Sequence, residues 1–165
     1  SVCAEAMSSR IKDNMNRIGL GKLTYLGIAL KQLITARKVS CTLTLEDKVH
    51  DKKESVELPR FLFVTCMSHR YEGGGFMFCP PAVDHDGVLD LCSVGNISKG
   101  LVLLALPTAF FGKHYFVKGI NAHTATQMSI TASAPLWVHT DGEVTRKSRG
   151  FRVECLPGAI RMITP

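Results

Sequence analysis

Apolar residues near the start of the chain recur at the spacing of an α-helix. Between Leu23 and Ile34 they fall three or four positions apart, with basic residues between them. This spacing predicts an amphipathic helix over residues 23–37. A more polar helix is predicted over residues 5–17, and Gly19 supplies a residue suited to end it.

From Val39 onward the period of the pattern changes to two. Val39, Cys41 and Leu43 alternate with polar residues, which is typical of a strand with one face in water. Further strands are predicted over residues 56–58, 61–67, 88–94, 125–133, 135–140, 150–155 and 160–163, and one helix over 98–111. Because short strands outnumber crossover helices, the predicted fold class is mainly β (α+β), an antiparallel β-sandwich of two packed sheets with peripheral helices.

The composition fits one packed domain over residues 1–165, with 45% hydrophobic and 21% charged residues. No apolar run is long enough to span a bilayer, and the longest, over residues 101–111, is interrupted by Pro107. The formal charge of +6 favours anionic partners such as phosphate, acidic lipid or nucleic acid, or else a solvated basic surface. Basic and aromatic residues do not alternate as they do in single-strand nucleic-acid binders, so nucleic acid is not an expected partner.

Two basic features stand out, the pair Lys113-His114 and the run over residues 146–149. Each is either a solvated stretch or a site that neutralises phosphate or attracts an anionic membrane surface. The apolar neighbours of Lys113 fit an interfacial role.

Six cysteines occur without a CxxC spacing, and several fall in strand-like apolar segments. We interpret them as reduced thiols in a cytosolic protein. A zinc site made of Cys66, His69 and Cys79 is an alternative, but its spacing matches no standard zinc knuckle.

The first candidate for chemistry is an acidic turn. Asp84, Asp86 and Asp90 surround Gly87, and their carboxylates, with nearby backbone carbonyls, are suitable ligands for Mg²⁺ or Ca²⁺. The segment is not an EF-hand, because it lacks the regular ligand set and the closing glutamate of that loop. The alternative is an ordinary Asp-Gly turn that leads into a strand.

The second candidate is Asp141-Gly142-Glu143, which lies between two strand-like runs. Asp-Gly in this setting is a strong signal for a tight β-hairpin turn, and a plain hairpin is one interpretation. If the turn faces a cleft, Asp141 or Glu143 can accept a hydroxyl proton or stabilise a metal, with His139 as a hydrogen-bond partner.

The order of several short motifs resembles the C-terminal domain of bacterial diacylglycerol kinases and related lipid kinases. The resemblance covers nearly the whole chain, and its motifs are residues 21–26, Gly73-Gly74-Gly75, residues 80–90, Gly112-Lys113-His114, residues 135–143 and Leu156-Pro157. It departs from the family pattern at Cys66-Met67-Ser68-His69 and at Cys3-Ala4-Glu5-Ala6.

The resemblance implies a two-domain, ATP-dependent enzyme. Its N-terminal α/β domain carries a Gly-Gly-Asp-Gly-Thr nucleotide motif, and its C-terminal β-sandwich supplies the lipid side. These 165 residues contain no such motif, P-loop or kinase glycine loop, and the chain begins at Ser1 without a methionine. We therefore expect a piece of a longer protein or a processed product, inactive as a kinase without the ATP-binding domain.

Carried over to matching positions, the resemblance makes Glu143, beside Asp141, the proton acceptor from the lipid hydroxyl. It also implies a structural Mg²⁺ site formed by the Asp86 carboxylate and the backbone carbonyls of Val83 and Val88. Asp84 is a competing ligand for that ion.

The resulting expectation is an enzyme that transfers the γ-phosphoryl group of ATP to a lipid hydroxyl, with diacylglycerol as the leading substrate and other lipid alcohols open. It would work in the cytoplasm at the membrane periphery, and a homodimer is left open. The rival hypothesis is a non-catalytic module whose basic surface binds acidic lipid or a protein partner.

Overall fold

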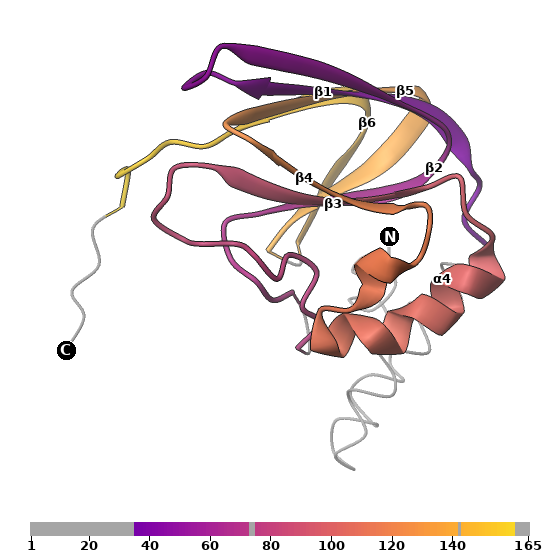
Figure 1. Cartoon of the computed structure of the whole chain (residues 1–165). Helices are drawn as coiled ribbons and strands as arrows, with labels where there is room; N and C mark the ends of the chain where they lie inside the picture. Colours follow the sequence, from indigo (N-terminus) through magenta and orange to yellow (C-terminus); the bar gives the residue numbers. More distant parts are fainter. Residues whose placement is uncertain (1–34, 73–74, 142, 161–165) are drawn as a thin grey trace.

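The computed structural model describes residues 35–72, 75–141 and 143–160 (Figure 1). The helix predicted over residues 5–17 and nearly all of the helix predicted over residues 23–37 lie outside the described residues. Most of the strand predicted over residues 160–163 also lies outside them.

The described chain is built mainly from one antiparallel sheet. Its strands run in the order β4-β3-β2-β1-β5-β6, and every neighbouring pair is antiparallel. The strands are β1 (Val39–Asp47), β2 (Lys52–Met67), β3 (Leu89–Gly95), β4 (Ile120–Ala125), β5 (Gln127–Thr140) and β6 (Glu143–Glu154). The predicted mainly β, antiparallel class is confirmed.

The sheet folds over on itself, so that β3 and β4 cross beneath β1, β5 and β6 (Figure 1). The 16-residue strand β2 takes part in both halves, pairing with β1 and with β3. Where β4 leads into β5, the Thr126 backbone N–H donates to the Glu46 carbonyl of β1 at 2.9 Å. The prediction of two separate sheets therefore needs correction, because the two layers belong to one continuous ladder.

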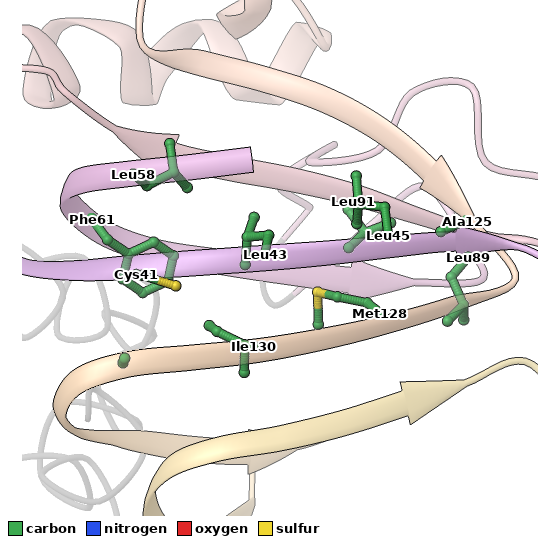
Figure 2. Packing of buried hydrophobic residues seen from close by; sticks show 11 residues of the cluster. Cys41, Leu43, Leu45, Leu58, Phe61, Leu89, Leu91, Ala125, Met128 and Ile130 are labelled. Atoms are coloured by element: carbon green, nitrogen blue, oxygen red, sulfur yellow. The ribbon is translucent and has the colours of Figure 1, made fainter. Parts of the chain in front are cut away.

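The main core lies between these two halves. Leu43 of β1, Leu91 of β3 and Met128 of β5 are almost completely buried and converge in Figure 2. Strand β3 is buried along its whole length. A strand covered on both faces need not alternate polar and apolar residues, and the two polar residues of β3, Asp90 and Ser93, are buried with the rest.

A helical segment follows β3 and contains α4 (Lys99–Ala105) and two 3₁₀ helices, η1 (Leu106–Phe111) and η2 (His114–Phe116). Ser98 caps α4, and its hydroxyl accepts a hydrogen bond from the Leu101 N–H at 3.2 Å. The single helix predicted over residues 98–111 is thus divided. Pro107 lies at the start of η1 and has no N–H to continue the α-helical pattern.

This segment packs its small and branched residues against β3 and β4, which gives a second core cluster. Within α4 and η1 the buried residues are Val102, Ala105 and Ala109. Within the residues that the structure describes, no helix is long and apolar enough to cross a bilayer.

Several predicted strand boundaries were wrong. Residues 56–58 and 61–67 belong to the one strand β2, and Pro59 lies where its register with β1 shifts, which is where a sheet tolerates proline. Strand β4 was missed because Asn121 and Thr124 dilute its apolar pattern. Strand β6 begins at Glu143 rather than at residue 150.

Candidate functional site

The predicted acidic hairpin is real, and it joins β5 to β6. Thr140 pairs with Glu143 across the turn, and both Asp141 and Glu143 are exposed. Asp141 adopts a left-handed conformation with φ of 47°, which Asp tolerates better than most residues. The two carboxylates are therefore carried by a tight turn whose backbone direction is set by the strands.

Contacts between β5 and β6 hold the base of this hairpin. The Lys147 ammonium lies 4.4 Å from the centre of the Trp137 ring, and the Thr145 hydroxyl donates to the Val138 carbonyl at 3.0 Å. The basic run over residues 146–149 is thus part of β6 rather than a loop. Its residues stabilise the hairpin that presents the acids.

A loop that begins at Glu72 lies within electrostatic reach of the hairpin. Glu72 and Phe76 close this loop by exchanging two backbone hydrogen bonds of 2.8 and 3.1 Å. Burial raises the pKa of the half-buried Glu72 carboxyl, while the nearby His139 and His69 act in the opposite direction. The sequence analysis did not select Glu72. No local sequence pattern indicates that His139, which lies far along the chain, comes near this residue.

The same loop is anchored to the helical segment by aromatic rings. Phe76 stacks on Phe110 with 4.2 Å between ring centres and on Phe78 with 5.7 Å. In addition, the Met77 N–H donates to the Ala109 carbonyl at 2.9 Å. The loop is therefore fixed on one side by η1.

The second acidic turn is built differently. The Asp86 carboxylate accepts the Val88 N–H at 3.0 Å, and Gly87 adopts a positive φ of 81°. Asp84 instead pairs with His85 at 2.7 Å, and this hydrogen bond lowers the pKa of Asp84. Asp86 is exposed, while burial raises the pKa of the Asp90 carboxyl, with the charge of Asp86 adding to the effect.

These donors are compatible with a hard cation. Asp86 offers an exposed carboxylate on a turn whose backbone carbonyls, at Val83 and Val88, are the other predicted ligands. A bound cation would also offset the unfavourable charge between Asp86 and Asp90. The described residues hold no cluster of three or more His, Cys, Asp or Glu side chains able to bind a metal. Cys66, His69 and Cys79 therefore form no such group, and neither do the carboxylates of Asp84, Asp86 and Asp90, so an ion at this turn would rely on backbone carbonyls beside the Asp86 carboxylate.

Two residues of the motif Gly112-Lys113-His114 have a structural role that the sequence did not indicate. His114 is buried, and its Nε2 lies 3.2 Å from the Phe78 carbonyl, which also accepts the Tyr115 hydroxyl at 2.6 Å. Position 112 requires glycine, because its φ is 65° and an added Cβ would lie 2.7 Å from the Pro80 side chain. The idea that His114 meets a phosphate or membrane is therefore wrong, and only Lys113 is exposed.

Four of the described cysteines, Cys41, Cys66, Cys79 and Cys92, are poor nucleophiles because burial raises the pKa of each thiol. Cys41, Cys66, Cys79, Cys92 and Cys155 are free thiols. Burial raises the pKa of Cys41 to about 11 and that of Cys66 to about 12. Thiols held in the protonated form serve here as small apolar residues, so the carboxylates of the hairpin are the stronger candidates for chemistry.

Comparison with known proteins connects these features to one family. Residues 1–164 match the profile of the "YegS C-terminal NAD kinase beta sandwich-like domain". A "Probable lipid kinase YegS-like" protein of Xanthomonas campestris is 30% identical over 148 residues, covering 88% of this chain and 45% of that protein. A "Diacylglycerol kinase" of Mycobacterium tuberculosis is 25% identical over 167 residues, covering 100% of this chain and 52% of that protein.

Solved structures agree on the fold. A diacylglycerol kinase crystal structure from Bacillus anthracis has a TM-score of 0.52 at 20% identity, covering 78% of this chain and 43% of that chain. Another structure from the same organism reaches a TM-score of 0.60 at 21% identity, covering 92% of this chain and 47% of that chain. The chain thus spans about half the length of these proteins or less.

The fold and the motif order define a C-terminal domain of the lipid kinase type. The chain belongs to the YegS C-terminal domain family, whose related proteins include lipid and diacylglycerol kinases.

Proposed function

We propose that this chain, joined to an ATP-binding domain, transfers the γ-phosphoryl group of ATP to the hydroxyl of a membrane lipid, with diacylglycerol as the first candidate. The observation that carries the proposal is the exposed Asp141-Glu143 turn on a hairpin held by its strands, in a chain of the lipid kinase family. We also propose that the enzyme acts at the periphery of the membrane, on the cytoplasmic side.

In the proposed reaction the lipid hydroxyl oxygen attacks the γ-phosphorus, and the bond from that phosphorus to the bridging oxygen of ADP breaks. Glu143 accepts the hydroxyl proton, with Asp141 as the alternative base. The turn directs the carboxylates, which favours positioned proton transfer. Glu72 lies close enough to His139 for the histidine to lower the pKa of the Glu72 carboxyl, so the two residues are expected to tune the field around the base.

Magnesium enters the proposal as a structural ion at the Asp86 turn. The Asp86 carboxylate and the backbone carbonyls of Val83 and Val88 would hold it, and the ion would neutralise the acidic turn that precedes β3. No chemical step is assigned to these residues. ATP is the co-substrate and would be bound mainly by the other domain.

The experiment is a phosphoryl-transfer assay with the full-length protein. Labelled ATP and dioleoylglycerol in mixed micelles should yield labelled phosphatidate, whereas the 165-residue chain alone should yield none, because it lacks a phosphate cradle. Absence of lipid phosphorylation by the full-length protein, across diacylglycerol and other lipid alcohols, would favour a non-catalytic lipid-binding module. Phosphatidate formation by the chain alone would refute the need for a second domain.

A further inference from the structure

The helical segment exposes an unusual amount of apolar surface. We name this set the helical apolar surface, and it consists of Leu101, Leu104, Phe110, Phe111 and Phe116. Leu104, Phe111 and Phe116 are 74%, 75% and 88% exposed, values that ordinary core packing does not produce. Single exposed apolar residues are common, but five within sixteen positions of one short segment call for a partner.

The exposure is not a consequence of loose packing. Val102 and Ala105 of α4 belong to the second core cluster, and Ala109 of η1 is buried as well, so the segment is attached by one face. Leu101 and Leu104 are three positions apart in α4 and share the opposite face of the helix. The helical segment lies along one side of the folded sheet, below β3 and β4 in Figure 1.

The stretch of sequence that contains this surface carries charged side chains of one sign. The sequence contains no Asp or Glu between Asp90 and Asp141, while Lys99, Lys113 and Lys118 fall within that stretch. Lys113 and Lys118 are exposed and border η2. Apolar side chains flanked by lysines are the composition of segments that lie in the interface of an anionic bilayer.

The same lack of acidic residues argues against a second copy of the chain. In a symmetric dimer the surface would meet itself, so that lysines would face lysines without a carboxylate from this stretch to pair with them. Anionic lipid headgroups would instead neutralise these ammonium groups. Charge complementarity therefore selects a bilayer as the partner.

The helical apolar surface is also coupled to the candidate site. Phe110 stacks on Phe76 at 4.2 Å between ring centres, and Phe76 closes the loop that begins at Glu72. Glu72 is within electrostatic reach of His139 on the strand that leads to the Asp141 turn. A membrane held at η1 would thus lie next to the loop that adjoins the candidate catalytic hairpin.

We propose that the helical apolar surface inserts shallowly into the interface of an anionic bilayer, with Lys113 and Lys118 contacting headgroups. This inference rests on the proposed function, because it identifies the membrane contact through which a lipid kinase would reach its substrate. The occupant is the lipid surface itself rather than a protein.

The test is sedimentation of the full-length protein with vesicles, without ATP. The wild-type protein should bind vesicles of phosphatidylglycerol and phosphatidylcholine. A triple variant, Leu104→Ser with Phe111→Ser and Phe116→Ser, should bind at least about a hundredfold more weakly, because three apolar side chains no longer leave water. The matched control is Val49→Ser, since Val49 is 75% exposed at the β1–β2 turn, on the opposite side of the molecule from α4 (Figure 1).

The electrostatic part is tested by Lys113→Glu combined with Lys118→Glu. This pair of changes should abolish the preference for phosphatidylglycerol over pure phosphatidylcholine vesicles, and wild-type binding should weaken as salt rises. Lys52→Glu, also exposed but in the β1–β2 hairpin, should keep the preference.

Three outcomes would overturn the inference. They are a wild-type protein that does not bind the anionic vesicles, a triple variant that binds as the wild type does, and a triple variant whose main change is a smaller oligomeric mass in light scattering. Unfolding midpoints should be measured for the triple variant and for Phe116→Ser alone, to establish that both variants are folded.

Failure of the proposed function would give a different result from failure of the membrane inference. On a short-chain, water-soluble diacylglycerol, the folded triple variant should keep wild-type turnover, because no bilayer is involved. If the wild-type full-length protein shows no kinase activity but binds vesicles, and the triple variant does not bind them, the kinase proposal is refuted and the membrane surface is supported.

Discussion

The chain uses the dipeptide Asp-Gly twice, and the two turns behave differently. At Asp86-Gly87 the glycine takes the positive φ, and the following strand β3 is buried throughout. At Asp141-Gly142 the aspartate itself has a positive φ, and the flanking Thr140 and Glu143 are exposed. Both turns are exposed, but one leads directly into a buried strand and the other projects from the end of a long hairpin.

This difference shows that the surroundings of an acidic turn decide what it can do. The Asp86 carboxylate is tied to its own backbone at Val88, and its neighbour Asp90 is buried. Such a turn is suited to bind an ion that stabilises the fold. The Glu143 carboxylate is open to solvent and to a substrate, so it is suited to take a proton.

The largest expected effect is on turnover. In the full-length protein Glu143→Gln should lower turnover by about a hundredfold or more, as expected for loss of a positioned base, and should spare ATP binding. Asp141→Asn is the matched control, because Asn also tolerates the left-handed backbone. Near wild-type rates in both variants, measured with a lipid substrate, would reduce the turn to a simple hairpin.

The next effect concerns magnesium. Saturating Mg²⁺ should stabilise the wild-type protein by about 2–3 kcal/mol at a hundredfold excess over its Kd. Asp86→Asn should lose this gain while it keeps an oxygen for the Val88 N–H, and Asp84→Asn should retain most of it. Calorimetry that finds equal magnesium stabilisation in the wild type and in Asp86→Asn would move the ion elsewhere.

A backbone change in the Asp86-Gly87 turn should have a smaller effect. Gly87→Ala should cost about 1–2 kcal/mol, because its φ of 81° disfavours a Cβ, which would also approach the Pro157 side chain to 3.3 Å. Gly100→Ala is the control, since it lies in α4 with nothing within 4 Å of an added Cβ. Urea unfolding should show that change to be neutral or stabilising.

The smallest effect is a pH dependence from His114. Burial lowers the pKa of His114, so the unfolded chain binds its proton more readily and stability should fall as pH drops below the unfolded value of about 6.5. His114→Gln should flatten this decline. His123, whose pKa burial also lowers, should leave a residual slope. Identical slopes in His114→Gln and the wild type would contradict the assignment.

Much of the fold could be predicted from sequence, because local periodicity reflects one-sided burial. Val39 to Leu45 alternates because one face of β1 packs on the core, and the Asp-Gly turn correctly located the β5–β6 hairpin. The β4 strand was not predicted, since Asn121 and Thr124 interrupt its apolar pattern. The basic run in β6 was not predicted as part of a strand, because local sequence does not show cross-strand contacts such as Lys147 on Trp137.

The candidate site was only partly predictable for the same reason. Asp141, Glu143 and Asp86 were found because each belongs to a short, recognisable turn. Glu72 depends on a histidine 67 positions later, and the burial of His114 depends on the Phe78 segment folding over it. No sequence window contains either relation.

The comparison of the two turns is tested most directly by measuring turnover and unfolding midpoint in parallel for full-length Glu143→Gln and Asp86→Asn. We expect Glu143→Gln to lose lipid phosphorylation and keep the wild-type midpoint in magnesium. Asp86→Asn should lower the midpoint in magnesium and, at temperatures where it remains folded, keep most of its turnover. The opposite pattern, or two variants that change in the same way, would contradict the division into a structural and a catalytic turn.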